Sequence, residues 1–161
     1  MAVGDTGLTF SPEIEARLEE AARLCSEQGA TLTPLRREVL GLVLSSQHPI
    51  GAYALLDHLR QSRSGAAPPT VYRALDFLLE RGFVHKVERL NAFIGCPSAI
   101  NHAGHEHGHA VQFLICTSCG RVTETEDEGI ASAIARAAER VGFRHTRATV
   151  EIEGLCRACA G

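Results

Sequence analysis

The stretch PPTVYRALDFLLERGFVHKVE, residues 68–88, decides the fold of this chain because the spacing of its apolar residues changes at Gly82. Up to that glycine, Val71, Leu75 and Leu78 recur every three or four residues and form one face of a helix. Glycine commonly ends a helix. Beyond Gly82 the period becomes two, which is the period of a strand. The stretch therefore predicts a helix that leads directly into a β-hairpin.

The rest of the first 96 residues completes this outline. Ser11 and Thr33 are each followed by proline, and this pair is a helix start signal because the hydroxyl can cap and proline is favoured at the first helical position. A third helix is expected over residues 51–61, and Asn91 is the expected hairpin turn. Helices followed by a two-stranded ribbon are typical of a winged helix, in which the last helix enters the major groove of DNA.

A second module follows the histidine-rich segment 97–110. Residues 111–115, 121–124 and 144–153 have strand character, and residues 130–141 have helical spacing before Gly142. The predicted fold class is therefore α+β. It comprises an N-terminal winged-helix DNA-binding domain in residues 1–96, a hinge or linker in 97–110 and a small α/β domain in 111–161.

Composition limits the class of protein. The 161 residues are 45% hydrophobic, as in ordered globular proteins, and no apolar run approaches the ~20 residues of a membrane span. Residues 1–10 lack the features of a signal or transit peptide, so a cytoplasmic location is expected. The formal charge of -3 argues against a generally sticky nucleic-acid binder, yet residues 30–90 carry eight basic side chains against five acidic ones.

Four of the six cysteines form two Cys-x-x-Cys pairs, Cys116 with Cys119 and Cys156 with Cys159. Two such pairs can close a tetrahedral all-thiolate shell, which suits Zn2+ and admits no water. Two disulfides or a redox pair are the alternative, and the expected reducing compartment favours a structural zinc. The segment between the pairs is too long for a zinc ribbon, so the metal would join the two ends of a small domain.

A second group of candidate ligands is spread over both modules: His85, Cys96, His109 and Glu124. One thiolate, two imidazoles and one carboxylate make a mixed shell suited to zinc. An ion shared across the hinge would bind only when the modules close, as expected of a sensor. The other linker histidines form a solvated loop or hold an additional ion, and they are His102, His105 and His107.

The helix that follows Pro68 carries the candidate DNA contacts. Thr70 is expected to cap it, free N–H groups at its start are expected to meet a phosphate, and Arg73 has the reach for a bidentate contact to guanine. The alternative is that these side chains merely cover a helix surface, but the winged-helix context and the basic surplus favour DNA contact. The predicted DNA-contacting residues are Tyr53, Arg73, Thr70, Tyr72 and Arg36.

The segments LTPLR at 32–36 and PTVYRAL at 69–75, with the two cysteine pairs, resemble the ferric uptake regulator family over nearly the whole chain. The segments GAYALL at 51–56, PPTVYRALDFLL at 68–79, GFVHKVE at 82–88 and GLC at 154–156 resemble its zinc uptake regulator branch from proteobacteria. The resemblance implies a homodimeric, zinc-activated repressor of zinc import genes, in which the second module is a dimerisation domain.

Carried over by position, the resemblance implies two Zn2+ per monomer. The structural ion would lie at Cys116, Cys119, Cys156 and Cys159, and the regulatory ion at His85, Cys96, His109 and Glu124. Tyr53 and Arg73 match base-contacting positions of the branch. The expected partners are double-stranded DNA with a palindromic operator and a second copy of the chain, and no membrane.

Several features of the sequence argue against other functions. Residues 110–115, AVQFLI, lack the His-His-Asp-His-type cluster of many iron, manganese and peroxide sensors, and Cys96 favours zinc over Fe2+ or Mn2+. Those sensors remain the alternative, and a cytoplasmic zinc-buffering or redox protein is a less favoured one. No enzyme and no catalytic residue is expected, because His105-Glu106-His107 lacks the rest of a zinc-enzyme motif and four protein ligands leave no open position.

Asp57 and Arg60 lie three residues apart on the expected third helix. They either pair within that helix, which is worth about 0.2–0.5 kcal/mol, or bridge adjacent dimers on one operator and make binding cooperative. The sequence leaves both alternatives open.

Overall fold

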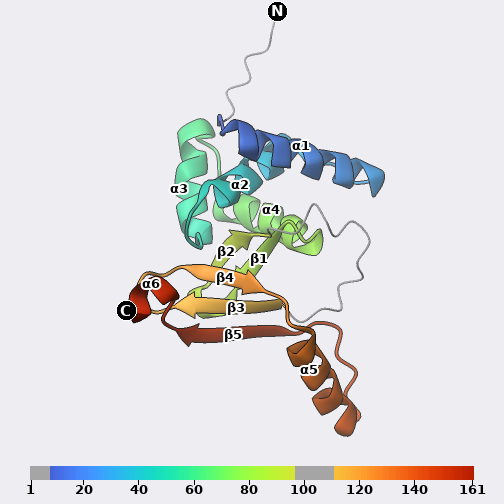
Figure 1. Cartoon of the computed structure of the whole chain (residues 1–161). Helices are drawn as coiled ribbons and strands as arrows, with labels where there is room; N and C mark the ends of the chain where they lie inside the picture. The colour runs from blue at the N-terminus through green and yellow to red at the C-terminus, as the bar shows by residue number, and fades with distance from the viewer. Residues whose placement is uncertain (1–7, 97–110) are drawn as a thin grey trace, which may run out of the picture. The chain divides into compact units, whose positions relative to one another are not determined.

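The structure, a computed structural model, describes residues 8–96 and 111–161 (Figure 1). The chain divides into two compact units, Met1–Ala103 and Gly104–Gly161. Mixed helices and sheets confirm the predicted α+β class. Within the described ranges, no helix combines the length and apolarity needed to cross a bilayer. The candidate ligands His102, His105, His107 and His109 lie outside the described residues.

The first unit consists of helices followed by a hairpin: α1 Pro12–Glu27, α2 Pro34–Ser45, α3 Ala52–Ser62, α4 Pro68–Glu80, β1 Val84–Val87, the 3-10 turn η1 Glu88–Leu90 and β2 Ala92–Gly95. Both predicted start signals are confirmed. The Ser11 side chain accepts a hydrogen bond from the backbone N–H of Ile14, and the Thr33 side chain accepts one from Arg36. Each hydroxyl therefore satisfies one N–H that a helix start leaves without an intrahelical partner.

The start of α4 differs from the expectation. Ala67, and not Thr70, is the N-cap residue, and it makes no side-chain capping bond. Pro68 and Pro69 occupy the first two helical positions, where their fixed φ suits the helix and their missing N–H is not needed. The predicted cap at Thr70 is therefore wrong. The predicted end is confirmed, because α4 stops at Glu80 and Gly82 adopts a φ of +71°.

The hairpin is confirmed with one addition. β1 and β2 pair antiparallel, from Val84 opposite Gly95 to Val87 opposite Ala92. The connection is the η1 turn followed by Asn91, whose φ of +46° lies in the left-handed region that asparagine tolerates. The Ile50 and Phe93 backbones exchange two hydrogen bonds of 2.9 Å, which tie the segment before α3 to the hairpin.

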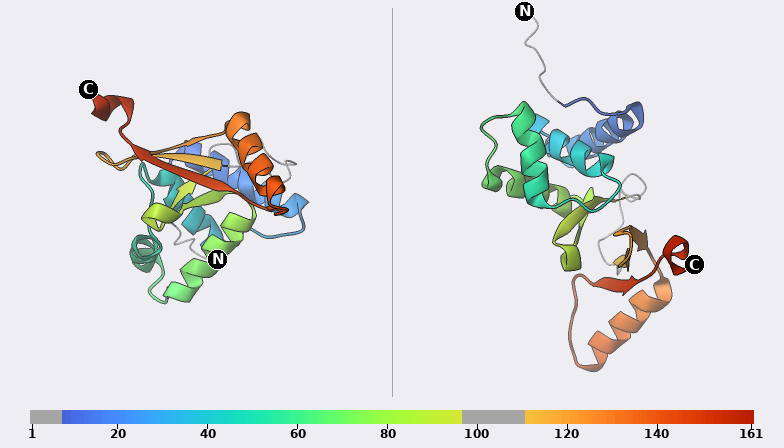
Figure 2. Two further views of the ribbon diagram at one scale, coloured as in Figure 1. Left: turned by 90° about the horizontal axis from the view of Figure 1, so that it is seen from below. Right: turned by 90° about the vertical axis from the view of Figure 1, so that its left-hand side faces the viewer.

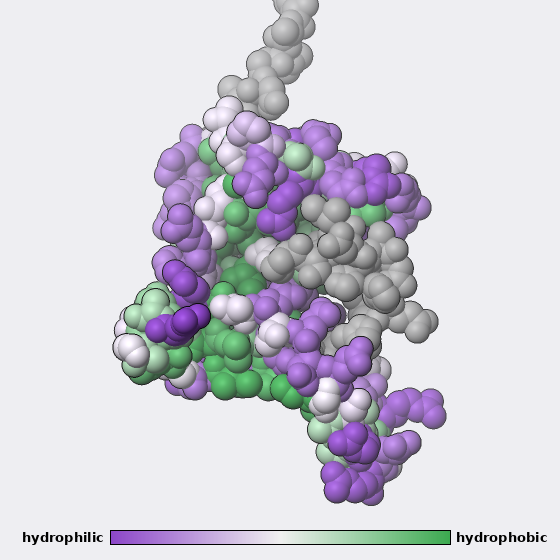
Figure 3. All heavy atoms as spheres, viewed as in Figure 1, coloured by the Kyte–Doolittle hydropathy of each residue, from purple (hydrophilic) through white to green (hydrophobic). Residues whose placement is uncertain are grey.

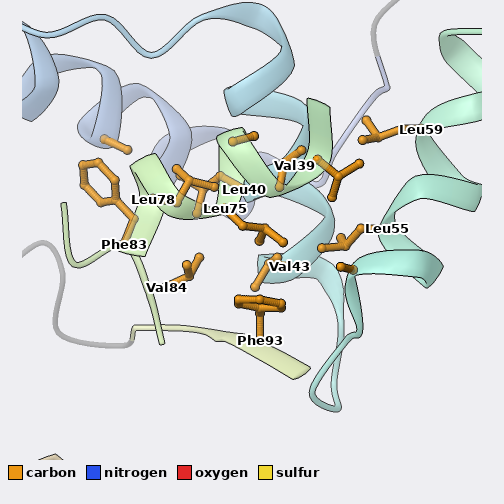
Figure 4. Close-up of a cluster of buried hydrophobic side chains, with 14 of the residues drawn as sticks. Val39, Leu40, Val43, Leu55, Leu59, Leu75, Leu78, Phe83, Val84 and Phe93 are labelled. Carbon is orange, nitrogen blue, oxygen red and sulfur yellow. The ribbon is translucent and has the colours of Figure 1, made fainter. Parts of the chain in front are cut away.

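The core of the first unit lies between its helices and the hairpin (Figure 4). Its labelled side chains come from α2 to α4, from the turn after α4 and from the two strands: Val39, Leu40, Val43, Leu55, Leu59, Leu75, Leu78, Phe83, Val84 and Phe93. Burying each large apolar side chain is worth roughly 1.5–3 kcal/mol. Because α4 turns its apolar stripe inward, its other face is left to solvent.

One carboxylate is buried with this core. Glu38 of α2 is 5% exposed and accepts hydrogen bonds of 2.9 and 2.8 Å from Nε and Nη2 of Arg63. Such a bidentate, charge-assisted pair offsets the cost of removing the carboxylate from water. Arg63 directly follows α3, and its carbonyl accepts from the Ala66 N–H. The pair therefore helps to shape the turn that leads into α4.

The second unit contains β3 Val111–Cys116, β4 Val122–Thr125, α5 Glu128–Arg140, β5 Thr149–Gly154 and the short α6 Arg157–Ala160. β3 is central, with β4 antiparallel and β5 parallel to it. The predicted order of two strands, a helix and a strand is confirmed. The last strand begins at Thr149 and not at residue 144, because residues 144–147, RHTR, offer no apolar alternation. The short α6 was not predicted.

The second unit leaves apolar side chains exposed. No residue of α5 is buried, and Figures 1 and 2 show this helix extending from the end of the sheet. Val141 and Phe143, just after α5, are 79% and 65% exposed. Leu114 and Ile152 are paired neighbours on β3 and β5 and are also exposed, and Figure 3 shows apolar surface over these strands. Contiguous surface of this kind is typical of an interaction site.

Gly41 of α2 packs against the ring of Phe10, and a Cβ at this glycine would overlap the ring. We predict that Gly41→Ala lowers the free energy of unfolding by about 1–3 kcal/mol, the usual cost of overpacking, although alanine is the better helix former by ~1 kcal/mol. Urea unfolding followed by circular dichroism measures the change.

The matched control is the same substitution in a Phe10→Ala background. Without the ring, Gly41→Ala should be neutral or stabilising by up to ~1 kcal/mol, because only helix propensity remains. Equal destabilisation in both backgrounds would show that the glycine is needed for another reason.

Candidate metal centre and nucleic-acid interface

The two Cys-x-x-Cys pairs converge at one end of the second unit. Cys116 ends β3, Cys119 lies in the turn before β4, Cys156 is the N-cap residue of α6 and Cys159 lies within α6. Their four Sγ atoms all lie within 4.8 Å of one another. All of these cysteines are free thiols. The sheet is responsible for this convergence, because β3 and β5 run parallel and Cys116 is paired with Gly154, two residues before Cys156.

Backbone hydrogen bonds hold the pairs in place. The Thr117 N–H donates to the Gly154 carbonyl over 2.9 Å, and the Cys156 N–H donates to Cys116 Sγ over 3.4 Å. Gly120 takes a φ of +71°, which a glycine adopts without strain, and its N–H donates to the Cys116 carbonyl. The first pair thus sits in a tight turn of the kind that presents two sulfurs to one ion.

The electrostatics of the cluster favour a thiolate at one position. Backbone N–H groups of Cys119, Cys156 and Ser118 donate to Cys116 and lower the pKa of its thiol to about 6. The Ser118 side chain lowers the pKa of Cys159, but hydrogen bonds with the other three thiols and burial outweigh it and raise that pKa to about 11. Four convergent sulfurs, one of them readily ionised, fit Zn2+ and leave no open coordination position.

The remaining two cysteines lie in the first unit, and their surroundings differ. Cys25 is 1% exposed in the core between α1 and its neighbours, where burial raises the pKa of its thiol. It behaves as a small apolar side chain. Cys96 directly follows β2 and is also buried, but a ligand atom of His85 on β1 lies within 4.8 Å of its sulfur.

Two of the four predicted regulatory ligands, His85 and Cys96, are therefore together on the hairpin of the first unit. A thiolate and an imidazole are both good zinc ligands, so this half of the predicted set fits the metal. Glu124 belongs to the second unit, where it lies on β4 opposite Phe113 of β3. His109 lies outside the described residues. The four-ligand regulatory site remains a prediction.

The predicted DNA-contacting face is exposed. Tyr53, in the first turn of α3, is 68% exposed, and Tyr72 on α4 is 43% exposed. Arg73 is also exposed, next to Tyr72 on the α4 face that points away from the apolar stripe. These side chains are available to an outside partner, and one of them carries a positive charge. Thr70 is half-buried in the first turn of α4.

The start of α4 does not offer the free N–H groups that the sequence suggested. Pro68 and Pro69 have no N–H, and those of Thr70 and Val71 donate to the Ala67 carbonyl over 2.9 and 3.4 Å. The expectation of a phosphate bound by free backbone donors is therefore wrong. The positive end of the helix dipole is what remains at this terminus.

Arg36 has partners within the first unit. Its guanidinium lies over the ring of Phe77 on α4, 3.7 Å from the centroid, and its Nη1 donates to the Thr31 carbonyl over 2.8 Å. The arginine thus links α2 to α4. A DNA contact by Arg36 remains a prediction, and any such contact would use a guanidinium already engaged in this packing.

Asp57 and Arg60 form a weak pair within α3. Arg60 Nη1 lies 3.7 Å from Asp57 Oδ1, both side chains are exposed, and Arg60 Nε also donates to the Ala66 carbonyl over 3.4 Å. A pair so exposed contributes little to stability. The intrahelical alternative is present in the structure, while the bridge between dimers remains a prediction.

The polar contacts of the first unit that sequence reasoning missed include Glu38 with Arg63, Arg36 with Phe77, and Arg17 with the Cys96 carbonyl. Of these contacts, the first alone had a signal in the sequence. Glu38 falls between Leu35 and Leu42 at helical spacing, so a charge was visible on an otherwise apolar face. The other two join residues whose proximity depends on how the helices pack.

Comparison with known proteins shows which family has this architecture. The model of the ferric uptake regulator family matches residues 27–153. The chain belongs to this family. Over 142 residues it is 43% identical to the zinc uptake regulation protein of Escherichia coli (strain K12), with coverage of 88% of this chain and 80% of that protein. The predicted membership of the zinc uptake regulator branch is confirmed.

Two solved structures of the same branch are similar. One is a zinc uptake regulator complexed with zinc and DNA, at 40% identity and a TM-score of 0.84, covering 93% of this chain and 97% of that one. The other is holo XcZur, at 43% identity and a TM-score of 0.80, covering 90% and 97%. These likenesses confirm the predicted order of a winged helix followed by a small α/β domain in this ferric uptake regulator family member.

We predict that Cys119→Ser removes one tightly bound metal ion per chain and unfolds the second unit, because binding free energy at a four-thiolate site is folding free energy. The first unit should keep its structure, since its core is separate. Metal analysis after gel filtration gives the stoichiometry, and amide hydrogen exchange shows which unit opens.

Cys25→Ala is the matched control, because it also removes a thiol but one that lies in the apolar core. It should leave metal content unchanged. If Cys119→Ser retained its metal and if the amides of β3 and β5 remained protected from exchange, the four-cysteine site would not be what stabilises this unit.

Proposed function

We propose that this protein is a zinc-responsive DNA-binding repressor of zinc uptake genes, with zinc as its corepressor. The observation that carries the proposal is a four-cysteine cluster joined, in one chain, to a winged helix whose α4 presents Arg73 outward. The similarity to a zinc uptake regulator complexed with zinc and DNA supports it. A cytoplasmic location follows from this role.

Two Zn2+ per monomer are proposed, with different tasks. Cys116, Cys119, Cys156 and Cys159 would hold the structural ion, and His85, Cys96, His109 and Glu124 the regulatory one. The closeness of His85 and Cys96 on the hairpin supports the second set. When bound, the regulatory zinc supplies a link between side chains of the two units. Neither set leaves a position for substrate, which supports a regulator and not an enzyme.

A homodimer is proposed through the second unit, with residues 1–96 as the DNA-binding domain, 97–110 as the hinge and 111–161 as the dimerisation domain. The exposed apolar side chains of this unit support the choice, since a second copy would cover them. Leu114 and Ile152 lie side by side on β3 and β5, and the apolar stripe of α5 is at most half-buried.

In this proposal the DNA-binding residues act as a symmetric pair. Arg73 would contact guanine in the major groove, with Tyr53 and Tyr72 beside it and Thr70 and Arg36 near the backbone. Two α4 helices related by a dimer axis would meet successive grooves of a palindromic operator. Closing the hinge brings them to that spacing. A shift from 1:99 to 99:1 in favour of the closed form requires ~5.5 kcal/mol of differential binding.

The function is tested by selecting bound genomic fragments with purified protein at fixed salt, in zinc, iron, manganese or a chelator that strips only the weaker site. We expect a palindrome to be enriched with zinc alone, and Cys96→Ser to lose this enrichment at limiting zinc while keeping its fold. Equal enrichment with iron or manganese would point to the sensor alternatives, and no enrichment under any condition would point to a zinc buffer.

Loading of two dimers on one operator is tested by charge reversal at Asp57 and Arg60. If these side chains bridge dimers, Asp57→Arg or Arg60→Asp alone abolishes cooperative binding in a gel-shift titration, and the double reversal restores it. Binding by one dimer should be unaffected. Unchanged cooperativity in both single variants would leave the pair with only its contact inside α3.

A further inference from the structure

The carbonyl of Cys96, at the end of the hairpin, has a partner far away in the sequence. Arg17 of α1 donates from Nη2 to this oxygen over 2.9 Å, although the residues are 79 positions apart. The N–H of Cys96 donates to the Phe83 carbonyl over 3.0 Å. Both backbone polar groups of Cys96 are therefore held, one by the segment that opens the hairpin and the other by a helix from the start of the unit.

The helix that supplies Arg17 is firmly attached. Its neighbour Leu18 is 0% exposed in the core of the first unit, and Leu24 and Cys25 are buried further along α1. Arg37 of α2 pairs with two carboxylates of α1, Glu15 and Glu19. The backbone that carries Arg17 is therefore held in place by the packing of α1. A hydrogen bond from a charged donor such as Arg17 is also stronger than one between neutral groups.

These bonds bear on the direction of the Cys96 side chain. With its N–H and its carbonyl both engaged, the backbone of Cys96 is restricted in φ and ψ. The Cα–Cβ bond then has a defined direction, and the backbone limits which staggered χ1 rotamers the sulfur can adopt. The sulfur lies within 4.8 Å of a ligand atom of His85, whose strand is paired with β2. Partners one step removed from a metal ligand commonly orient it and raise its affinity.

We propose that Arg17 is a positioning residue of the regulatory zinc site: it holds the backbone of Cys96 so that this thiol and His85 form a preset half-site on the first unit. The proposal rests on the proposed function for the identity of the two ligands. It also gives α1 a part in metal sensing, because the affinity of the half-site then depends on a contact that this helix provides.

Three variants test the proposal. Arg17→Met removes the donor and keeps an unbranched side chain, whereas Arg17→Lys keeps the charge and a donor. Arg23→Met is the matched control, because Arg23 lies on the same helix and, among the described residues, forms its ion pairs with Glu20 and Glu27 of that helix. In full-length protein with the four-cysteine site filled, zinc affinity of the second site is measured by competition with a chromophoric chelator. Amide exchange of Cys96 is measured before the second site is loaded.

We expect Arg17→Met to bind the second zinc about tenfold more weakly, at the low end of the effect of removing an outer partner of a ligand. Arg17→Lys should lose less, and Arg23→Met nothing. The Cys96 amide should exchange faster in Arg17→Met, and cobalt at the second site should show an altered sulfur-to-metal charge-transfer band. If Arg17→Met did not fold, Arg17→Ala takes its place, since it also removes the donor: weaker binding of the second zinc relative to Arg23→Met would support the proposal, and no loss would overturn it.

Unchanged second-site affinity and unchanged Cys96 exchange in Arg17→Met would overturn the proposal, whatever happens to the melting temperature, since an arginine with a merely structural role lowers stability alone. Failure of the proposed function is distinguishable: a parent protein that bound one zinc and ignored zinc in DNA binding would refute that function. Even then, Cys96 exchange in Arg17→Met would support the positioning contact if faster and overturn it if unchanged.

Discussion

Four thiols converge where the end of β3 meets the C-terminal segment, in a unit that buries few of its side chains. In residues 111–161, the buried side chains are Phe113, Ile115, Cys116 and Gln112. A core of this size rarely contributes more than about 3–5 kcal/mol, whereas the apparent binding free energy of a structural zinc site is about 10–16 kcal/mol. The parallel pairing of β3 with β5 places Cys116 beside Cys156, and an ion bound by these cysteines would in turn stabilise the sheet.

The first unit, in contrast, is stabilised by a large apolar core. Its helices and hairpin enclose a continuous apolar cluster, so no cross-link is needed to hold them. Because the core takes one face of α4, the other face is free to carry Tyr72 and Arg73. Polar contacts hold segments of this unit that lie outside the helices and strands. Glu38 binds Arg63 at the turn before α4, and Arg17 donates to Cys96 just after β2.

Much of the architecture could be predicted because its signals are local. The caps at Ser11 and Thr33, the helix end at Gly82 and the turn at Asn91 each depend on a few neighbouring residues. The errors have local causes too. Two consecutive prolines moved the start of α4 ahead of Thr70 and removed its free N–H groups, and the polar run at 144–147 delayed β5 to Thr149. Contacts such as Arg17 with Cys96 had no local signal at all.

The sequence by itself determined the element order up to β5, the family and the two Cys-x-x-Cys pairs that form one cluster, because periodicity, caps and Cys-x-x-Cys spacing act over short distances. Tertiary structure alone decided which polar groups from distant segments meet. It placed Arg36 on Phe77 and buried Glu38 against Arg63. It also set the Cys96 sulfur near His85. The physical reason is that a hydrogen bond between residues 79 positions apart is created by helix packing, and packing is a property of the whole core and not of any segment.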